Sequence, residues 1–238
     1  MSKDLELIET PPAPQAGTGR PKGGYKNKAG KRVPGTTTIT GRFKESGGLV
    51  HWAWQCGLDG LDINQVRDDA ADAGTCGHEM IHCHIMGRAF DYSEYPEHIW
   101  KPAEHAYLAY LEWATQSTLK VQVAEQALVS EKHQFGGTLD AIYASNTLRL
   151  LDYKTSNGLY ADMLIQVAGG YSLLWEENYP DQPLHGVDLL RISKPKHPDD
   201  PVSFEHRHFS AEIFGPCQKA FLLMRELYDL DKRVKGLL

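Results

Sequence analysis

Residues 136–143 read Gly-Gly-Thr-Leu-Asp-Ala-Ile-Tyr, and residues 148–155 read Leu-Arg-Leu-Leu-Asp-Tyr-Lys-Thr. Their alternating apolar side chains predict two neighbouring β-strands. Because alternate side chains share one face of a strand, we expect Asp152 and Lys154 to lie side by side at the end of an apolar row, with Asp140 beside them on the other strand. Two acids and a lysine at one end of a sheet indicate a divalent-metal site suited to phosphodiester hydrolysis.

The rest of the chain surrounds these two strands with helical and extended patterns. Helical spacing predicts helices over residues 48–85, a helix pair over 97–117, and helices over 160–178 and 211–234; period-two patterns predict strands over 121–129, 186–193 and 202–209. Residues 25–40 are expected to be extended, with a short hairpin at 27–30. These elements predict an α/β fold with a central mixed β-sheet flanked by helices and an N-terminal helical region.

Composition indicates an ordinary globular protein behind a short leader. The 238 residues are 41% hydrophobic and 24% charged, which permits a substantial core. Residues 1–22 are rich in Pro and Gly and are expected to form a flexible leader, with residues 23–238 forming a single domain. Four scattered cysteines suggest reduced thiols and a cytoplasmic location, and the absence of an apolar run of about 18 residues argues against a membrane span or secretion signal.

A basic stretch lies within an acidic protein. The net charge is −6, yet residues 10–44 contain no acid and eight basic residues. Such a stretch favours contact with a polyanion at one surface. The alternative is a solvated basic tail, which is equally compatible with the part before Tyr25.

Three expected strands each place one acid on a mostly apolar face. These acids are Glu125, Asp140 and Asp152. A buried carboxylate is costly unless it is paired or bound to a cation, and carboxylate oxygens are the ligands that Mg²⁺ or Mn²⁺ accepts. Lys154 could orient or deprotonate the attacking water or stabilise the transition state.

These residues resemble a known family of nucleases. The motifs are Glu125, Gly137-Thr138-Leu139-Asp140, Asp152-Tyr153-Lys154-Thr155, Gln166 and the upstream Gly74-Thr75-Cys76-Gly77-His78. Together they resemble the PD-(D/E)xK superfamily in its RecB-like exonuclease branch, with a restriction-endonuclease-like core. Residues 30–39 are similar to the opening of phage-encoded and mitochondrial genome-maintenance exonucleases. The resemblance spans about residues 25–195.

The resemblance implies roles for single residues. Asp140 and Asp152 would be metal ligands, completed by the Tyr153 carbonyl. Lys154 would be the catalytic lysine, and Glu125 an outer acid that binds metal or positions water. The remaining implied roles are a further metal ligand at His78 and a supporting glutamine at Gln166. The candidate DNA contacts are Arg32, Thr37, Arg42, Lys44, Tyr171 and Lys194; of these, Arg42, Lys44 and Lys194 are singled out by their charge, and such a lysine or arginine alone is more often a solvated charge.

One position departs from the family pattern. The family has a tyrosine four residues after its glutamine, whereas position 170 is Gly and the tyrosine falls at Tyr171. The role of Gln166 is retained in this interpretation, and the role of Tyr171 is open.

The resemblance also implies an activity and partners. It indicates a DNA exonuclease that uses one or two Mg²⁺ or Mn²⁺ ions and acts on linear ends in phage or prophage recombination, replication or repair, in the cytoplasm of a bacterial host. A phage single-strand annealing or single-strand-binding protein is a possible partner. The branch's iron–sulfur members need three clustered downstream cysteines; here only Cys217 lies downstream, so we expect no cluster.

Two other functions compete with this interpretation. One is a non-catalytic nucleic-acid-binding protein on the same fold, although such a protein gains nothing from clustered acids. The other is a zinc metallopeptidase, because His78-Glu79-Met80-Ile81-His82 matches the motif H-E-x-x-H. That motif is short, needs a third ligand downstream, and leaves the Asp-x-Lys pattern unexplained.

Overall fold

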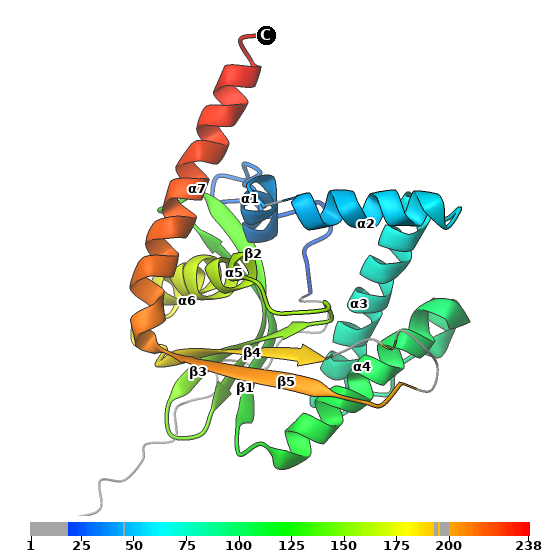
Figure 1. The fold of residues 1–238 in the computed structure, drawn as a ribbon. Helices are drawn as coiled ribbons and strands as arrows, with labels where there is room; N and C mark the ends of the chain where they lie inside the picture. Colours follow the sequence, from blue (N-terminus) through cyan, green and yellow to red (C-terminus); the bar gives the residue numbers. More distant parts are fainter. Residues whose placement is uncertain (1–18, 45, 193–194, 196–199) are drawn as a thin grey trace, which may run out of the picture.

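The computed structural model of this chain describes residues 19–44, 46–192, 195 and 200–238 (Figure 1). The expected leader, residues 1–22, falls largely outside the described residues, and so does Lys194. No described helix combines the length and the hydropathy that a membrane span requires.

A five-stranded mixed sheet forms the centre of the fold. Its strands follow the chain order, β1-β2-β3-β4-β5. The β3–β4 pair is parallel and the other three pairs are antiparallel. The bounds are β1 Lys120–Ser130, β2 Phe135–Ala144, β3 Leu148–Lys154, β4 Gly186–Ile192 and β5 Phe204–Ser210. The predicted α/β class with a mixed sheet is therefore confirmed.

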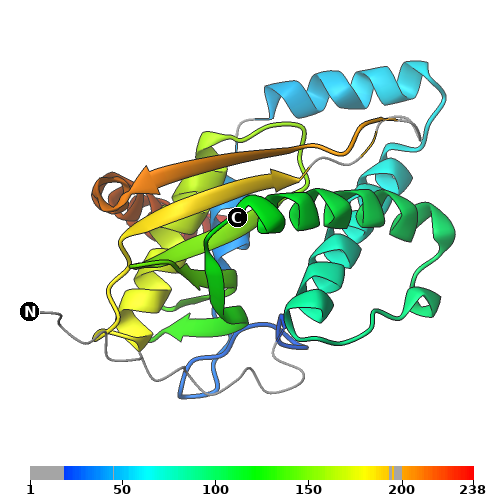
Figure 2. The ribbon, with the colours of Figure 1, turned by 90° about the horizontal axis from the view of Figure 1, so that it is seen from below.

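Helices cover both faces of the sheet (Figures 1 and 2). The N-terminal helical region comprises α1 Thr36–Arg42, α2 Gly47–Leu58, α3 Ile63–Ile85 and α4 Glu97–Gln116, with a short 3-10 turn at Tyr92–Glu94. The later helical elements are α5 Ala161–Leu164, a π-helical segment Ile165–Tyr171, α6 Ser172–Asn178, a 3-10 turn Ala211–Ile213 and α7 Phe214–Lys235.

The sheet divides the interior into two cores. On one face, α1, the π-helical segment, α6 and α7 pack against Leu150, Val187 and Leu189. On the other face, α3 and α4 pack against Leu151 and Leu190. The alternation along β3 thus sends successive side chains into different cores. Within β3, Asp152 and Lys154 come two and four residues after Leu150, so they lie on the same face of the strand as Leu148 and Leu150.

Two local predictions were wrong. Residues 36–40 were expected to be extended, but they form most of α1. The Thr36 hydroxyl donates to the Gly136 carbonyl oxygen (3.0 Å), and Ile39 is fully buried, so tertiary packing overrides the β-preference of this run. The expected helix pair over 97–117 is a single helix, α4, which continues through Pro102.

Candidate active site

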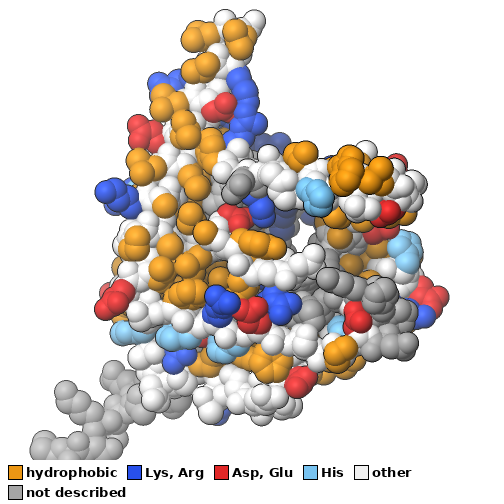
Figure 3. Space-filling view, viewed as in Figure 1, with side chains coloured by type: hydrophobic (Ala, Val, Ile, Leu, Met, Phe, Trp, Pro, Cys, Tyr) orange, Lys and Arg blue, Asp and Glu red, His pale blue; other side chains and the backbone are white. Residues whose placement is uncertain are grey.

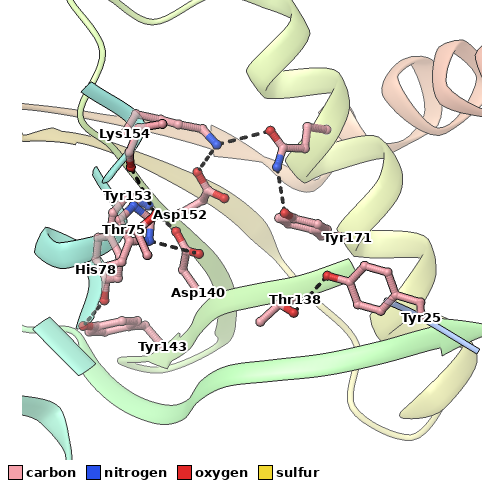
Figure 4. A network of polar contacts seen from close by, with 12 residues as sticks. Tyr25, Thr75, His78, Thr138, Asp140, Tyr143, Asp152, Tyr153, Lys154 and Tyr171 are labelled. Atoms are coloured by element: carbon pink, nitrogen blue, oxygen red, sulfur yellow. Dashed lines mark hydrogen bonds and ion pairs between the residues drawn. The ribbon is translucent and has the colours of Figure 1, made fainter. Parts of the chain in front are cut away.

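Three elements bring metal-ligand side chains together beside the middle of the β1–β2 pair. They are His78 on α3, Glu125 on β1 and Asp140 on β2, and one ligand atom of each lies within 4.8 Å of the other two. His78 Nδ1 is 3.5 Å from Asp140 Oδ1 (Figure 4). Over the residues that the structure describes, this is the single set of three or more His, Cys, Asp and Glu side chains with such spacing. One imidazole and two carboxylates suit Mn²⁺ or Mg²⁺.

The backbone of Glu125 is in an unusual conformation. Its φ is +50°, in the left-handed region that non-glycine residues rarely adopt. The neighbouring pairs Ala124–Ala141 and Gln126–Leu139 keep β1 and β2 in register on both sides. Such a conformation costs about 1–3 kcal/mol and persists only where the surroundings impose it. The sheet therefore holds Glu125 in a strained position at the acid cluster, as is typical of functional sites.

Asp152 and Lys154 form the second part of the site. Asp152 is only 1% exposed, and Lys154 Nζ lies 2.6 Å from its Oδ2 (Figure 4). The backbone N–H of Tyr153, between them, donates to Asp140 Oδ2 at 2.8 Å. This bond ties the end of β3 to the metal-ligand set. The structure thus pairs Asp152 with Lys154, and the ligand roles of Asp152 and the Tyr153 carbonyl stay predictions.

The π-helical segment explains why the tyrosine comes one residue late. Gln166 Oε1 accepts from Lys154 Nζ at 3.3 Å, and Gln166 Nε2 donates to the Tyr171 hydroxyl at 2.7 Å (Figure 4). Residues five apart face each other in a π-helix, as residues four apart do in an α-helix. Tyr171 therefore reaches Gln166 despite the extra residue. It is buried, so the structure gives it a partner inside the protein, and a contact with DNA remains a prediction.

Two glycines allow this segment to pack closely. A Cβ at Gly169 would lie 2.5 Å from the carbonyl oxygen of Cys217 on α7, and a Cβ at Gly170 would lie 2.3 Å from Cγ2 of Thr36 on α1. Any larger residue would push α7 or α1 away. The two helices therefore fix the π-helical turn that orients Gln166.

The electrostatics of the site show an excess of acids. Burial, helped by Asp140, raises the pKa of Glu125 to about 8. Burial also raises the pKa of Asp152 to about 6, although Lys154 opposes this. Burial alone would lower the pKa of His78, but Asp140 and Glu125 outweigh it and raise that pKa to about 9. For Asp140, burial is outweighed by His78 and Lys154, which lower its pKa. Without a metal, the site is expected to hold protons where a cation would fit.

A cleft opens onto the metal-ligand set. Its volume is about 550 Å³, and it is lined by His78, Glu125 and Asp140 together with Thr75, Thr138, His82, Arg88 and Arg20. Sequence reasoning missed Thr75 and Arg88 as candidate site residues. Thr75 lies within the quoted Gly-Thr-x-x-His motif and could have been found there. Arg88 follows the end of α3, where no periodicity points to it.

Two of the predicted DNA contacts outside the cleft have ion-pair partners of their own. Arg42 forms an ion pair with Asp231 on α7 (2.8 Å), and Lys44 forms one with Asp162 (3.0 Å). Neither lines the cleft. The other predicted contacts near the N-terminus, Arg32 and Thr37, are exposed. Lys194 lies outside the described residues.

The histidine pair of the zinc motif acquires no third ligand. Among the described residues, no set of closely spaced ligand atoms contains both His78 and His82. Glu79, the general base of that hypothesis, accepts a hydrogen bond from the Tyr95 hydroxyl at 2.8 Å. The geometry therefore gives the metallopeptidase hypothesis no support.

Comparisons with known proteins give only a loose similarity. No family model matches the chain, and no curated protein matches it. Two solved structures are similar in shape: an alkaline exonuclease (LHK-Exo) from Laribacter hongkongensis, and LHK-Exo in complex with dAMP. Each is 14% identical, with a TM-score of 0.34, over 71% of this chain and 92% of theirs. At this TM-score the similarity carries no argument, so the functional case depends on the residues of the site.

Proposed function

We propose that this chain is a divalent-metal-dependent nuclease that hydrolyses phosphodiester bonds of DNA. The observation that carries the proposal is the His78, Glu125 and Asp140 set beside the Asp152–Lys154 pair. A nucleic-acid-binding module has no use for an acid-rich buried cluster, which repels phosphate and costs stability. A metal-dependent phosphodiesterase needs such a cluster.

The residues of the chain divide the chemical tasks between them. A divalent ion bound by His78, Glu125 and Asp140 would lower the pKa of a bound water and offset charge on the phosphoryl oxygens. Lys154 Nζ forms an ion pair with Asp152 Oδ2 at 2.6 Å. Lys154 would orient the attacking water and stabilise negative charge in the transition state.

The second contact of the lysine fixes its position. Gln166 accepts from Lys154 Nζ, and the Tyr171 hydroxyl in turn accepts from Gln166. This chain of hydrogen bonds limits the directions in which the ammonium group can point. We expect it to affect the rate of the chemical step more than the binding of DNA.

The cleft supports a nucleic-acid substrate. Arg88 and Arg20 supply positive charge near the acid cluster, where they can contact phosphates flanking the scissile bond. The proposed substrate is linear DNA with a free end, and the proposed setting is phage or prophage recombination, replication or repair in a bacterial cytoplasm. A phage single-strand annealing or single-strand-binding protein is the proposed partner.

The test is cleavage of end-labelled linear DNA alongside a covalently closed circle of the same sequence. We expect cleavage of the linear DNA with Mg²⁺ or Mn²⁺, none in EDTA, and recovery when the metal is restored. Asp152→Ala and Lys154→Ala should each abolish cleavage and leave the fold intact. Binding of DNA without any cleavage would favour the non-catalytic alternative, and metal-dependent digestion of casein would favour a peptidase. Robust cleavage by either variant would refute the site.

A further inference from the structure

The long helix α7 carries two apolar faces. The inner face packs on the core beneath it and consists of Phe214, Cys217, Phe221, Met224 and Tyr228. The second face, which we call the outer stripe, consists of Leu223, Leu227, Leu230 and Val234. At 100° per residue the two faces point in directions roughly 120° apart. The core therefore accounts for only one of them.

The outer stripe is exposed to solvent. Leu223 is 58% exposed, Leu227 48%, Leu230 40% and Val234 60%. The C-terminal half of α7 projects beyond the body of the protein, and orange apolar side chains follow it along its length (Figures 1 and 3). A contiguous apolar stripe of this kind on a projecting helix marks an interaction site.

The spacing of the outer stripe is that of a coiled-coil seam. Its residues are separated by four, three and four positions, and Leu237 continues the pattern three positions later. In heptad terms Leu223 and Leu230 occupy d positions, and Leu227 and Val234 occupy a positions. A helix with a seam of this pattern fits a second helix with the same pattern.

The charges beside the seam select the orientation of that second helix. Glu226 and Arg233 lie on one flank, and neither forms an ion pair with another described residue. On the other flank, Asp231 already contacts Arg42 at 2.8 Å and Lys235 at 3.1 Å. In a parallel pair of identical helices, Glu226 would face Asp231 of the second copy, an acid against an acid.

An antiparallel pair removes that conflict. Leu223 then packs on Val234 of the second copy and Leu227 on its Leu230, and the twofold axis repeats both contacts. In the same register Glu226 faces Arg233 of the second copy, twice. Because this half of α7 projects from the body, an antiparallel arrangement places the two bodies at opposite ends of the helix pair (Figure 1).

We propose that the outer stripe of α7 is the interface through which two copies of this chain associate, with their α7 helices antiparallel and Glu226 paired with Arg233 of the second copy. The apolar seam supplies the stabilisation, and the charge pairs select direction and register. The proposal is independent of the candidate active site, which lies between α3 and the β1–β2 pair.

The first experiment measures mass against concentration by analytical ultracentrifugation of the full chain. We expect a concentration-dependent dimer for the wild type and a monomer for the double variant Leu227→Glu, Leu230→Glu. Both positions are exposed in the single copy, so circular dichroism should show an unchanged fold. A wild-type protein that stays monomeric, or a double variant that still dimerises, would overturn the proposal.

The second experiment tests direction by charge reversal. Glu226→Arg alone and Arg233→Glu alone should each weaken dimerisation by roughly tenfold, because like charges then face each other twice. Mixing the two variants should restore association as a heterodimer with two Arg–Glu pairs. Lys232→Glu, on the side of α7 away from the outer stripe, is the matched control and should leave the strength of dimerisation unchanged. Failure of the mixture to associate better than either variant alone would exclude the antiparallel register.

Discussion

Two buried groups of charged side chains lie on the same sheet and differ in their balance of acids and bases. At the candidate site, the carboxylates of Glu125, Asp140 and Asp152 lie beside two basic side chains: His78 Nδ1 is 3.5 Å from Asp140 Oδ1, and Lys154 Nζ is 2.6 Å from Asp152 Oδ2. On β4, by contrast, a single fully buried carboxylate is surrounded by three basic side chains. Asp188 Oδ1 lies 2.7 Å from His206 Nε2, 3.2 Å from His208 Nδ1 and 3.8 Å from Arg149 Nη1.

The difference shows which buried acids require an external cation. Around Asp188, one arginine and two histidines supply partners for Oδ1, so the carboxylate can serve stability. Among the five candidate site residues three acids face two bases, and the pKa values of Glu125 and Asp152 rise to about 8 and about 6 as a result of burial. A buried acid with a raised pKa destabilises the fold at neutral pH, so its retention there fits a role in binding a cation.

The sharpest contrast should come from neutralising Asp152. We expect Asp152→Asn to lower the rate of DNA cleavage by roughly a thousandfold or more, about 4 kcal/mol in the barrier. Its pKa of about 6 lies above the ordinary value, so the ionised form lowers stability as pH rises through that range. At pH 7.5 the variant should therefore melt at the same temperature as the wild type or higher. Asp181→Asn, at an exposed position, is the matched control. An Asp152→Asn protein that melts at a lower temperature but cleaves DNA normally would contradict the proposed difference between the two groups of charges.

The affinity of the His78, Glu125 and Asp140 set for a metal ion should depend on pH. With pKa values near 9 and 8, His78 and Glu125 hold protons at pH 7 that a metal must displace. The apparent affinity for Mn²⁺ should therefore rise with pH between 7 and 9, by up to roughly a hundredfold per pH unit if two protons leave. The readout is the increase in melting temperature on adding Mn²⁺ at pH 7, 8 and 9.

The metal-free protein should show the opposite trend. The raised pKa of His78 contributes stability below its ordinary pKa of 6.5, and this is lost as pH rises through about 9. The raised pKa of Glu125 costs stability as pH rises from 4.5 to about 8. Without metal, the melting temperature should thus fall between pH 7 and 9. His78→Ala should flatten the Mn²⁺ response and Asp188→Asn should retain it; an equal response in both variants would rule out the assigned ligands.

Neutralising the buried acid on β4, Asp188, should lower stability and leave activity unchanged. Asp188→Asn removes the shared partner of His206, His208 and Arg149, so we expect a loss of about 1–3 kcal/mol in the free energy of unfolding. For a chain of this size, that corresponds to a fall in melting temperature of roughly 2–4 °C per kcal/mol. The rate of cleavage per folded molecule should not change. Loss of cleavage with unchanged melting would mean that the two groups do not differ as described.

The parts of the site that sequence could predict are those set by local alternation. The period of two placed Asp152 and Lys154 on one face because strand geometry depends only on adjacent residues. Glu125 was predicted on the same grounds, but the left-handed backbone that holds it there has no signature in the sequence. The central sheet was predictable for the same reason, since each strand has its own alternating pattern.

The parts that sequence could not predict depend on distant contacts. The π-helical turn that brings Tyr171 to Gln166 is fixed by the close approach of Gly169 to Cys217 on α7. Arg42 appeared free to contact DNA because Asp231, its partner, lies far along the chain. Helix α1 formed from a β-branched run because the sheet buries one of its faces. Each case required the packing of segments that no local pattern connects.

The smallest predicted effect concerns how firmly Lys154 is held beside the acids. Tyr171→Phe removes the acceptor of the 2.7 Å hydrogen bond from Gln166, whose other end contacts Lys154. We expect kcat to fall by roughly fivefold, about 1 kcal/mol, with little change in KM. Tyr179→Phe is the control, because that ring packs against Trp175 and has no contact with Gln166 or Lys154 among those of the described residues.

A double-mutant cycle identifies the route of this effect. If Tyr171 acts through Gln166, the double variant Gln166→Ala, Tyr171→Phe should lose no more activity than Gln166→Ala alone. Additive losses would mean that Tyr171 affects the site by another path. The ion pair with Asp152 would then be the contact that positions Lys154 beside the acids.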